Sequence, residues 1–447
     1  MRVLLANPET SRSFYDFAGI IDDEPYELEC LQAHLKGKGI EAEIWDGQSD
    51  KDFRRTFTDY KPDCVYFCGR TRQENFIKEY CEYSSNPVSW TKSGKVVTVV
   101  GGIHAQNCPE RFREDYIDYI VSTFDPSAVS DIIEGKAPEE IAGISWNDGG
   151  IWHVNGKVPY DITEMPWADR TNFYRYGAKY CYLELRPIAV IRTAFSCPYS
   201  CAFCYRNRLN CHRYTARDIE DVVNEIESID CENIYIIDDD FLVNILRLER
   251  FIGLIKERNI HRKFVCFGRA DFIAKYPHVI KKLAGIGFYY ILTGLEYIEN
   301  RRLNDTNKRN NVNTNVRALR TCQENGINMM GMFITDLDFT AHDFGNLYKW
   351  IRHFDLKHVA ISIYTPEMCL ENFEEYKDRL ITQDPAEWDY LHVVAKPEKL
   401  SVRRYYFHYH ILLIRLFLRA KRQGVYDFMD YKAFIKSFLK NLFRFGG

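Results

Sequence analysis

Three cysteines, Cys197, Cys201 and Cys204, stand four and three residues apart in this sequence of 447 residues. Thiolates at this spacing on one loop can bind three irons of a cubane iron–sulfur cluster and leave the fourth iron open to a small molecule. No fourth cysteine follows at ferredoxin spacing. Structural zinc is the alternative, with Cys211 and His212 as spare ligands, but zinc sites favour CxxC pairs. The pattern therefore favours a cluster with an open iron.

The last of these cysteines is preceded directly by an aromatic residue, Phe203. A CxxxCxxC segment with that aromatic resembles the signature of radical S-adenosylmethionine enzymes. The resemblance implies a [4Fe-4S] cluster on the three cysteines whose open iron chelates S-adenosyl-L-methionine. It also implies an electron donor such as flavodoxin or ferredoxin, and a 5′-deoxyadenosyl radical that takes a hydrogen atom from substrate. The protein itself would bind and orient these groups and exclude water.

The composition is that of an ordinary globular protein, with 46% hydrophobic and 27% charged residues. The 14 cysteines have no paired spacing, which favours reduced thiols in the cytoplasm. The opening residues lack the features of a signal peptide, and no run of about 18 apolar residues occurs. We therefore expect a cytoplasmic enzyme.

Residues 1–150 alternate short apolar runs with helical patterns. The expected strands cover 3–6, 41–45, 63–68, 95–100 and 119–121. Such alternation predicts a doubly wound parallel sheet, in which ligands bind at the carboxyl ends of the strands. The fourth strand ends at Gly101 and Gly102, followed by His104. Paired glycines at that place permit close approach of the backbone to a bulky ligand.

This Gly-Gly-x-His-Ala turn resembles the cobalamin-binding domain that precedes the radical domain in one subclass of the family. The resemblance implies a Rossmann-like domain in which Gly101, Gly102 and His104 line a cobalamin site. His104 would reach the cobalamin tail, and its structural alternative is to cap a loop. The Asp-x-His-x-x-Gly motif of other cobalamin proteins is absent, as is common in the subclass. The run from Ser122 to Pro126 replaces a usual Gly-Glu-Gly-Glu run, which alters the edge of the predicted pocket.

Residues 151–186 lack a sustained period and are predicted to be a linker. Residues 187–370 then repeat strand and helix about six times. The expected strands cover 187–193, 233–238, 264–268, 288–293, 328–334 and 358–364. Six units match the partial TIM barrel typical of the family. We therefore expect an α/β fold: a doubly wound sheet, a partial (β/α)6 barrel, and a helical C-terminal region over 371–447.

Polar residues follow several of the expected barrel strands, where β/α barrels place their functional groups. The resemblance implies that Asp239 or Asp240 contacts the amino group of S-adenosylmethionine, while Arg269 binds its carboxylate and Glu296 lines the same pocket. Tyr205 would flank the adenine or shield the cluster. Each has a structural alternative, as a loop cap, an internal ion pair or a buried aromatic. The aspartates could also suit a magnesium or calcium ion, although adjacent strand residues point to opposite faces.

The C-terminal end is basic. Between Lys399 and Gly447, eleven Lys or Arg accompany two Asp, which gives this end a net charge of about +9. Because the whole chain carries −4, the rest of it carries about −13. Phe434, Phe438 and Leu442 recur at helical spacing, and a basic strip accompanies them: Lys432, Lys436, Lys440 and Arg444. This amphipathic helix has three interpretations: nucleic-acid binding, for which no known module is visible, peripheral contact with an anionic membrane, or a cap on the barrel. We expect no nucleic-acid partner.

The most frequent reaction of the cobalamin subclass is methylation of an unactivated carbon. The resemblance therefore predicts a C-methyltransferase acting on a small-molecule or lipid-like substrate. Two S-adenosylmethionine molecules would serve each turnover, one as the methyl source and one as the radical source. A radical rearrangement or cyclisation enzyme, with cobalamin in another role or unused, is the alternative. A non-catalytic iron–sulfur sensor is a second alternative, for which a complete barrel is unnecessary.

Overall fold

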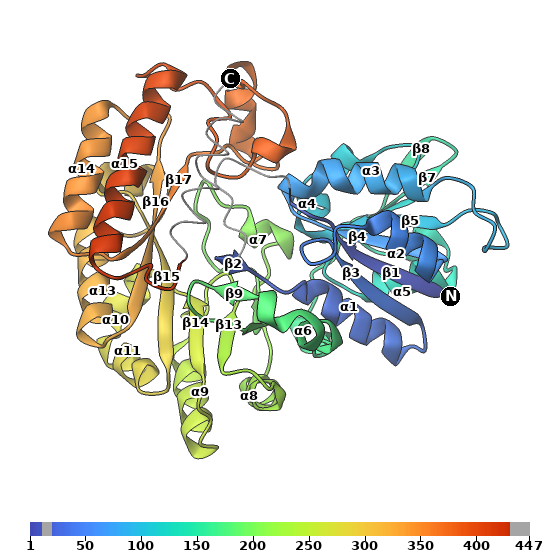
Figure 1. Cartoon of the computed structure of the whole chain (residues 1–447), viewed down its shortest axis with the longest axis horizontal. Coiled ribbons are helices and arrows are strands. Elements are labelled where there is room, and N and C mark those ends of the chain that lie inside the picture. Colours follow the sequence, from blue (N-terminus) through green and yellow to red (C-terminus); the bar gives the residue numbers. More distant parts are fainter. Residues whose placement is uncertain (11–19, 430–447) are drawn as a thin grey trace.

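The computed structural model describes residues 1–10 and 20–429, which form two α/β units placed side by side (Figure 1). The first unit contains a seven-stranded sheet of order β3-β1-β4-β5-β6-β7-β8. Its strands are β1 (Arg2–Asn7), β3 (Glu41–Asp46), β4 (Cys64–Cys68), β5 (Val97–Gly101), β6 (Tyr119–Val121), β7 (Ile144–Asp148) and β8 (Ile151–Val154). The first five in chain order are parallel, as predicted, and β7 and β8 extend the sheet as an antiparallel hairpin.

Alternate residues of β1 face two separate cores. Val3 and Leu5 pack with α1 (Tyr26–Gly37) and α5 (Ser127–Glu134), whereas Leu4 and Ala6 pack with α2 (Phe53–Tyr60) and α3 (Glu74–Ser84). The sheet is thus covered on both faces, which explains why its inner strands are continuous apolar runs. The strand order reverses between β1 and β4, and ligands of such sheets bind in the crevice at that point.

The second unit is a six-stranded parallel sheet in sequential order, without pairing between its first and last strands. The strands are β10 (Ile188–Ile191), β13 (Asn233–Ile236), β14 (Lys263–Phe267), β15 (Phe288–Glu296), β16 (Asn328–Thr335) and β17 (His358–Ile363). All six overlap the predicted strands, so the open (β/α)6 barrel is confirmed.

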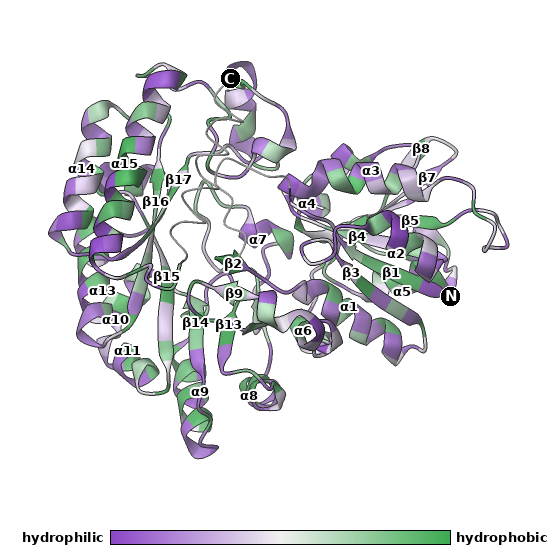
Figure 2. Cartoon of the chain, in the orientation of Figure 1, coloured by the Kyte–Doolittle hydropathy of each residue, from purple (hydrophilic) through white to green (hydrophobic). Residues whose placement is uncertain are grey.

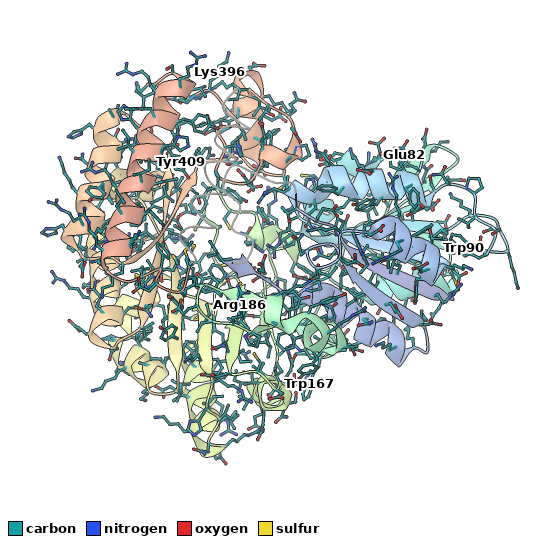
Figure 3. All side chains as sticks on the ribbon, in the orientation of Figure 1. Glu82, Trp90, Trp167, Arg186, Lys396 and Tyr409 are labelled. Carbon is teal, nitrogen blue, oxygen red and sulfur yellow. The ribbon has the colours of Figure 1, made fainter. Side chains whose placement is uncertain are left out.

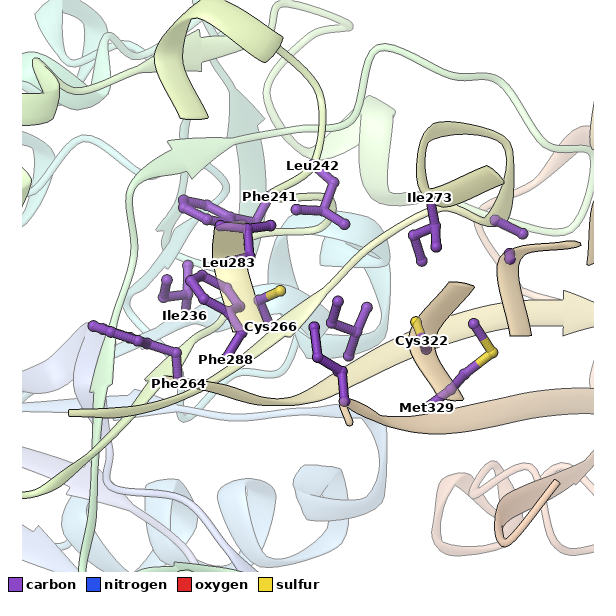
Figure 4. Packing of buried hydrophobic residues seen from close by; sticks show 14 of the residues in the cluster. Ile236, Phe241, Leu242, Phe264, Cys266, Ile273, Leu283, Phe288, Cys322 and Met329 are labelled. Carbon is purple, nitrogen blue, oxygen red and sulfur yellow. The ribbon is translucent and has the colours of Figure 1, made fainter. Parts of the chain in front are cut away.

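Helices cover the outer face of this sheet: α8 (Ile219–Ser228), α9 (Ile245–Glu257), α10 (Ala270–Lys275), α11 (Pro277–Ala284), α13 (Val312–Glu324) and α14 (Ala341–His353). Figure 4 shows part of the core between them, where Phe264 and Phe288 of neighbouring strands stack with ring centroids 5.1 Å apart. Leu283 of α11 lies in the same cluster and packs against these strands from outside.

The C-terminal region contains α15 (Val402–Arg422), in agreement with the predicted helical character. The side chain of Ser401 caps its first turn by accepting a hydrogen bond from the Arg404 amide. Tyr409, labelled in Figure 3, donates to the Ile361 carbonyl of β17 at 2.9 Å, so α15 closes the edge of the barrel. The predicted basic helix around 432–444 lies outside the described residues. No helix within 1–10 or 20–429 has the length and apolar character needed to cross a bilayer.

The segment between the two sheets is a packed junction and not only a connection. The first sheet continues to Val154, past residue 150, and the segment also contains α6 (Thr171–Tyr176). Arg170 lies buried between the units, where its guanidinium pairs with Glu24 at 2.7 Å and with Glu225 at 3.0 Å. Because Glu24 belongs to the first unit and Glu225 to α8, this arginine ties the two units together.

Candidate active site

The three predicted cluster cysteines lie on the cysteine loop, residues 196–214, at the carboxyl end of the barrel sheet. Two short strands, β11 (Ala194–Phe195) and β12 (Thr215–Ala216), pair antiparallel and hold the two ends of the loop together. On its far side, the Ala202 amide donates to the Thr306 carbonyl at 3.0 Å, and Asn307 donates to the Ser200 carbonyl at 2.8 Å. The loop is therefore fixed at both sides while its three thiols stay partly exposed.

The three thiols are the predicted ligands of the cluster. In the part of the chain that the structure describes, no three His, Cys, Asp or Glu side chains lie close enough together to hold one metal ion. In a cubane each thiolate binds a different iron, so its three ligands lie farther apart than those of a single ion. Burial raises the pKa of Cys197 to about 12 and that of Cys204 to about 11. Cluster loading therefore has to release the protons of both thiols.

The aspartates after β13 have three different environments. The Asp238 carboxylate accepts hydrogen bonds from the amides of Thr193 at 2.6 Å and Ala194 at 3.0 Å, which positions the start of the cysteine loop. Asp239 forms an ion pair with Arg206 at 3.4 Å. Each of these two carboxylates is thus engaged within the chain.

Asp240 differs because one of its oxygens has a free acceptor position. Its Oδ1 accepts from the Leu242 amide at 3.1 Å, whereas the buried Oδ2 has no hydrogen-bond partner among the described residues. Burial raises the pKa of this carboxyl to about 7, although the nearby Arg269 lowers it. A buried carboxylate with a free oxygen is suited to accept a hydrogen bond from an ammonium group.

Arg269, directly after β14, lies against the cysteine loop. Its Nη1 is 3.8 Å from the Cys201 sulfur, and its Nη2 donates to the Lys308 carbonyl at 2.7 Å. Its Nε pairs with Asp271 at 3.0 Å, and its guanidinium lies 3.8 Å from the centroid of the Tyr199 ring. The structure therefore brings Arg269 to the cluster cysteines, and binding of a carboxylate by this side chain stays a prediction.

Glu296 ends β15 at an irregular point of the strand. Its φ is +58°, and the register with β16 shifts between Gly294 and Glu296. Lys308 Nζ pairs with its Oε1 at 2.8 Å and lies 5.9 Å from the centroid of Phe203. A Cβ at Gly294 would lie 2.1 Å from that oxygen, so the glycine makes room for the pair. Burial would lower the pKa of Lys308, but Glu296 and Cys201 raise it, and the lysine stays charged.

Tyr205 lies at the face between the two units. The helix after it, α7 (Arg206–Leu209), contacts α4 (Gly102–Asn107) of the first unit (Figure 1). The Arg206 guanidinium is 5.3 Å from the Tyr205 ring centroid. Arg70, at the carboxyl end of β4, lies within electrostatic range of Tyr205. The carboxyl edge of the first sheet therefore adjoins the cysteine loop.

The paired glycines make a close approach, but to the chain's own atoms. Gly102 has φ +86°, and a Cβ there would lie 2.7 Å from the Gly69 amide nitrogen. A Cβ at Gly101 would lie 2.0 Å from the Tyr66 hydroxyl. Both positions thus require glycine for the fold of the sheet edge alone, and their contact with a ligand stays a prediction.

His104 is engaged by side chains of the first unit. Its Nε2 is 2.6 Å from the Glu74 carboxylate, and its Nδ1 is 3.3 Å from the Thr71 hydroxyl. Arg111 also pairs with Glu74, at 2.6 Å. Burial would raise the pKa of Glu74, but the hydrogen bonds from His104 and Arg111 outweigh it and hold that pKa at about 2. This imidazole therefore anchors α4 within the first unit, which is the structural alternative of a cap.

Sequence reasoning missed several residues of the site. Tyr199 occupies an unspecified position inside the CxxxCxxC segment, and Lys308 belongs to no motif. Only the tertiary fold brings Tyr199 to Arg269 and Lys308 to Glu296. Arg70 carried a usable signal, because a glycine precedes it at the end of a predicted strand, as at Gly101. A search of every strand end for small residues next to a charge would have found it.

Comparison with known proteins agrees with this architecture. The model of the radical SAM superfamily matches residues 191–351, which include the three cysteines. The chain is 24% identical to the hopanoid C-3 methylase of Methylococcus capsulatus, over 86% of this chain and 74% of that protein. It is also 24% identical to an anaerobic magnesium-protoporphyrin IX monomethyl ester cyclase of Rubrivivax gelatinosus, over 98% of this chain and 83% of that protein.

Two solved structures have the same two-unit fold. OxsB, a cobalamin-dependent S-adenosylmethionine radical enzyme with aqua-cobalamin bound, superposes with a TM-score of 0.66 at 20% identity. The match covers 80% of this chain but 53% of OxsB, so this chain spans about half the length of that protein. The methyltransferase TsrM from Kitasatospora setae, with cobalamin and a [4Fe-4S] cluster bound, superposes with a TM-score of 0.65 at 20% identity over 84% of this chain and 78% of TsrM.

Residues 191–351, which hold the three cysteines, therefore form a radical SAM domain. The chain as a whole shares its two-unit fold with the cobalamin-dependent enzymes OxsB and TsrM.

Proposed function

We propose that this protein is a cobalamin-dependent radical S-adenosylmethionine enzyme that methylates an unactivated carbon of a small-molecule or lipid-like substrate. The observation that carries the proposal is the contact between α7, which follows the cluster cysteines, and α4, which follows the glycine turn of the first sheet. It supports the proposal because it joins the cysteine loop of the barrel to the helix that follows the glycine turn of the first sheet.

The residues at these edges fit the three groups that the proposal needs. Cys197, Cys201 and Cys204 would hold the cluster, and Asp240 and Glu296 would contact the amino-acid portion of S-adenosylmethionine. When bound, the cluster supplies the electron that cleaves S-adenosylmethionine, and cobalamin supplies a carrier for the methyl group. The carboxyl edge of β4 and β5 would contact the cobalamin.

The charges around the cysteine loop support this assignment. Arg269 and Lys308 place two cations beside Cys201, where they offset part of the negative charge of three thiolates. The free Oδ2 of Asp240 would accept a hydrogen bond from the ammonium group of S-adenosylmethionine. Since Arg269 and Asp240 are buried, both interactions would form away from bulk water, where they are strongest.

A radical cyclisation is the second candidate. It is favoured by the cyclase of Rubrivivax gelatinosus, whose match covers nearly the whole of this chain and therefore both units. Under this alternative the cysteine loop does the same work, and no methyl group reaches the product.

Methyl-labelled S-adenosylmethionine separates the candidates. The reconstituted protein, a low-potential donor and cell extract are incubated without oxygen, and products are resolved by mass spectrometry. The proposal predicts label in a product other than methionine, absent with Cys201→Ala. If 5′-deoxyadenosine forms while all label stays in methionine and unreacted S-adenosylmethionine, cyclisation or rearrangement replaces methylation. Failure to cleave S-adenosylmethionine at all would favour a non-catalytic sensor.

The proposed setting is the reducing cytoplasm, with flavodoxin or ferredoxin as electron donor. All 14 cysteines are free thiols within the described residues. Free thiols in this number fit a compartment that keeps them reduced. Peripheral contact with a membrane is part of this proposed setting.

A further inference from the structure

Helix α15 is held to the barrel by one apolar face. Tyr405, Tyr409 and Leu412 are almost completely buried there. The Tyr405 hydroxyl donates to the Thr335 carbonyl at 2.8 Å, and Tyr409 makes the equivalent bond to β17. Arg419 adds a bond of 2.7 Å to the Leu356 carbonyl. From Tyr405 to Arg419 these contacts span about four helical turns, so they fix the rotation of the helix about its axis.

A second apolar face of α15 points away from the barrel. It is formed by four large side chains that we call the apolar stripe, with exposed fractions of 59%, 37%, 49% and 47%: Phe407, Ile411, Ile414 and Leu418. At 3.6 residues per turn, these positions fall within an arc of about 60°, roughly 160° from the buried face. Since the helix cannot turn without breaking its tyrosine contacts, the stripe stays on the outward side of α15. Helix α15 lies beside α14 at the barrel edge (Figure 1), and Figure 2 shows both hydrophobic and hydrophilic residues along it.

The other exposed positions of α15 are all basic: Arg403, Arg404, Arg415, Lys421 and Arg422. The helix contains no Asp or Glu over its 21 residues. An ordinary solvated helix carries charges of both signs and few large apolar residues on its outer face. Here basic side chains stand at both ends of an apolar stripe, which is the pattern of helices that lie in a lipid interface.

We propose that the apolar stripe and its flanking basic residues form a docking surface for an anionic lipid membrane. The large aliphatic and aromatic side chains would enter the acyl boundary, while Arg403, Arg404, Lys421 and Arg422 would meet anionic head groups. The proposal places the membrane contact on α15 itself. It concerns where the protein resides and does not depend on the reaction that it catalyses.

Charge argues against the two other occupants of the stripe. A second copy packed stripe to stripe would set the basic ends of one helix beside the basic ends of the other. The segment 430–447 has four basic residues and one acidic residue in its sequence, so it also carries the same sign as the surface. An anionic lipid surface complements both the charge and the apolar character.

Sedimentation of the full-length protein with lipid vesicles tests the proposal. Vesicles of phosphatidylcholine alone are compared with vesicles containing phosphatidylglycerol, at low and high salt. The test variant is Ile411→Glu/Leu418→Glu. The matched control is Ile151→Glu/Leu246→Glu, which makes the same charge change at two side chains that are 66% and 77% exposed elsewhere. Circular dichroism verifies that both variants are folded.

The proposal predicts binding to the anionic vesicles that weakens with salt, about tenfold or more weaker for the stripe variant and unchanged for the control. Equal binding of the stripe variant and the unmodified protein would overturn it. So would equal binding to neutral vesicles, or loss of binding on Phe438→Glu/Leu442→Glu alone, which would assign the contact to the C-terminal segment. A dimer that dissociates on Ile411→Glu/Leu418→Glu, without vesicle binding, would assign the stripe to a second copy.

Discussion

Replacing Lys308 by methionine removes the charge that balances Glu296 without a large change in side-chain volume. The Lys308 and Glu296 side chains are only 9% and 10% exposed, and their charged atoms are 2.8 Å apart. Removing one partner of such a buried pair leaves an uncompensated charge and typically costs about 3–5 kcal/mol. The backbone carbonyl of Lys308 still accepts from Arg269, so the cysteine loop keeps its support.

Urea unfolding followed by circular dichroism, with the free energy of unfolding taken from each transition, measures the effect of Lys308→Met. The double variant Lys308→Met/Glu296→Gln should recover much of the loss, because neither charge is then left unpaired. The matched control is Lys263→Met, whose partner Glu232 is 3.2 Å away in an exposed pair and whose loss should cost about 1 kcal/mol or less. The reasoning is refuted if Lys308→Met and Lys263→Met are equally stable, or if the double variant is no more stable than Lys308→Met.

Two further predictions concern the first unit. Gly102→Ala should lower the melting temperature and abolish uptake of hydroxocobalamin, because its Cβ would meet the Gly69 backbone at 2.7 Å. The control Gly135→Ala has a similar φ of +77° with open space around it, so it should show only the smaller strain. Uptake by Gly102→Ala at the normal level would contradict this. Glu74→Gln should lose the most stability near neutral pH, about 3 kcal/mol, because the folded pKa of Glu74 is about 2 and lies below its ordinary value of 4.5. Its deficit should shrink as pH falls below about 4.5, and a pH-independent deficit in thermal melts would be the contrary result.

Much of the fold could be predicted because both sheets bury their strands on two faces. β4 and β10, for example, contain almost only apolar residues, so they are visible in the sequence as short continuous runs. The hairpin of β7 and β8 was not predicted, since its outer strand is mostly exposed and carries no such run. Gly149 and Gly150 form its turn, directly before the predicted start of the linker at residue 151.

The site was predictable where its chemistry is local in sequence. The three cysteines lie within eight residues, and the strand-end positions of Arg269 and Glu296 follow from the barrel pattern. The direction of a side chain is not encoded in that way. His104 follows a strand end too, yet its imidazole turns inward to Glu74, and Lys308 reaches Glu296 only because a loop between two helices folds over the barrel.

The open-iron cluster is the central claim, and cleavage of S-adenosylmethionine by anaerobically reconstituted protein tests it most directly. The amount of 5′-deoxyadenosine is compared between the unmodified protein, the triple variant Cys197→Ala/Cys201→Ala/Cys204→Ala and the control Cys211→Ala, with iron and zinc measured in each. We predict four irons per chain and 5′-deoxyadenosine formation in the unmodified protein and in Cys211→Ala, and neither in the triple variant. Retention of iron and cleavage by the triple variant, or zinc in place of iron in the unmodified protein, would contradict the assignment.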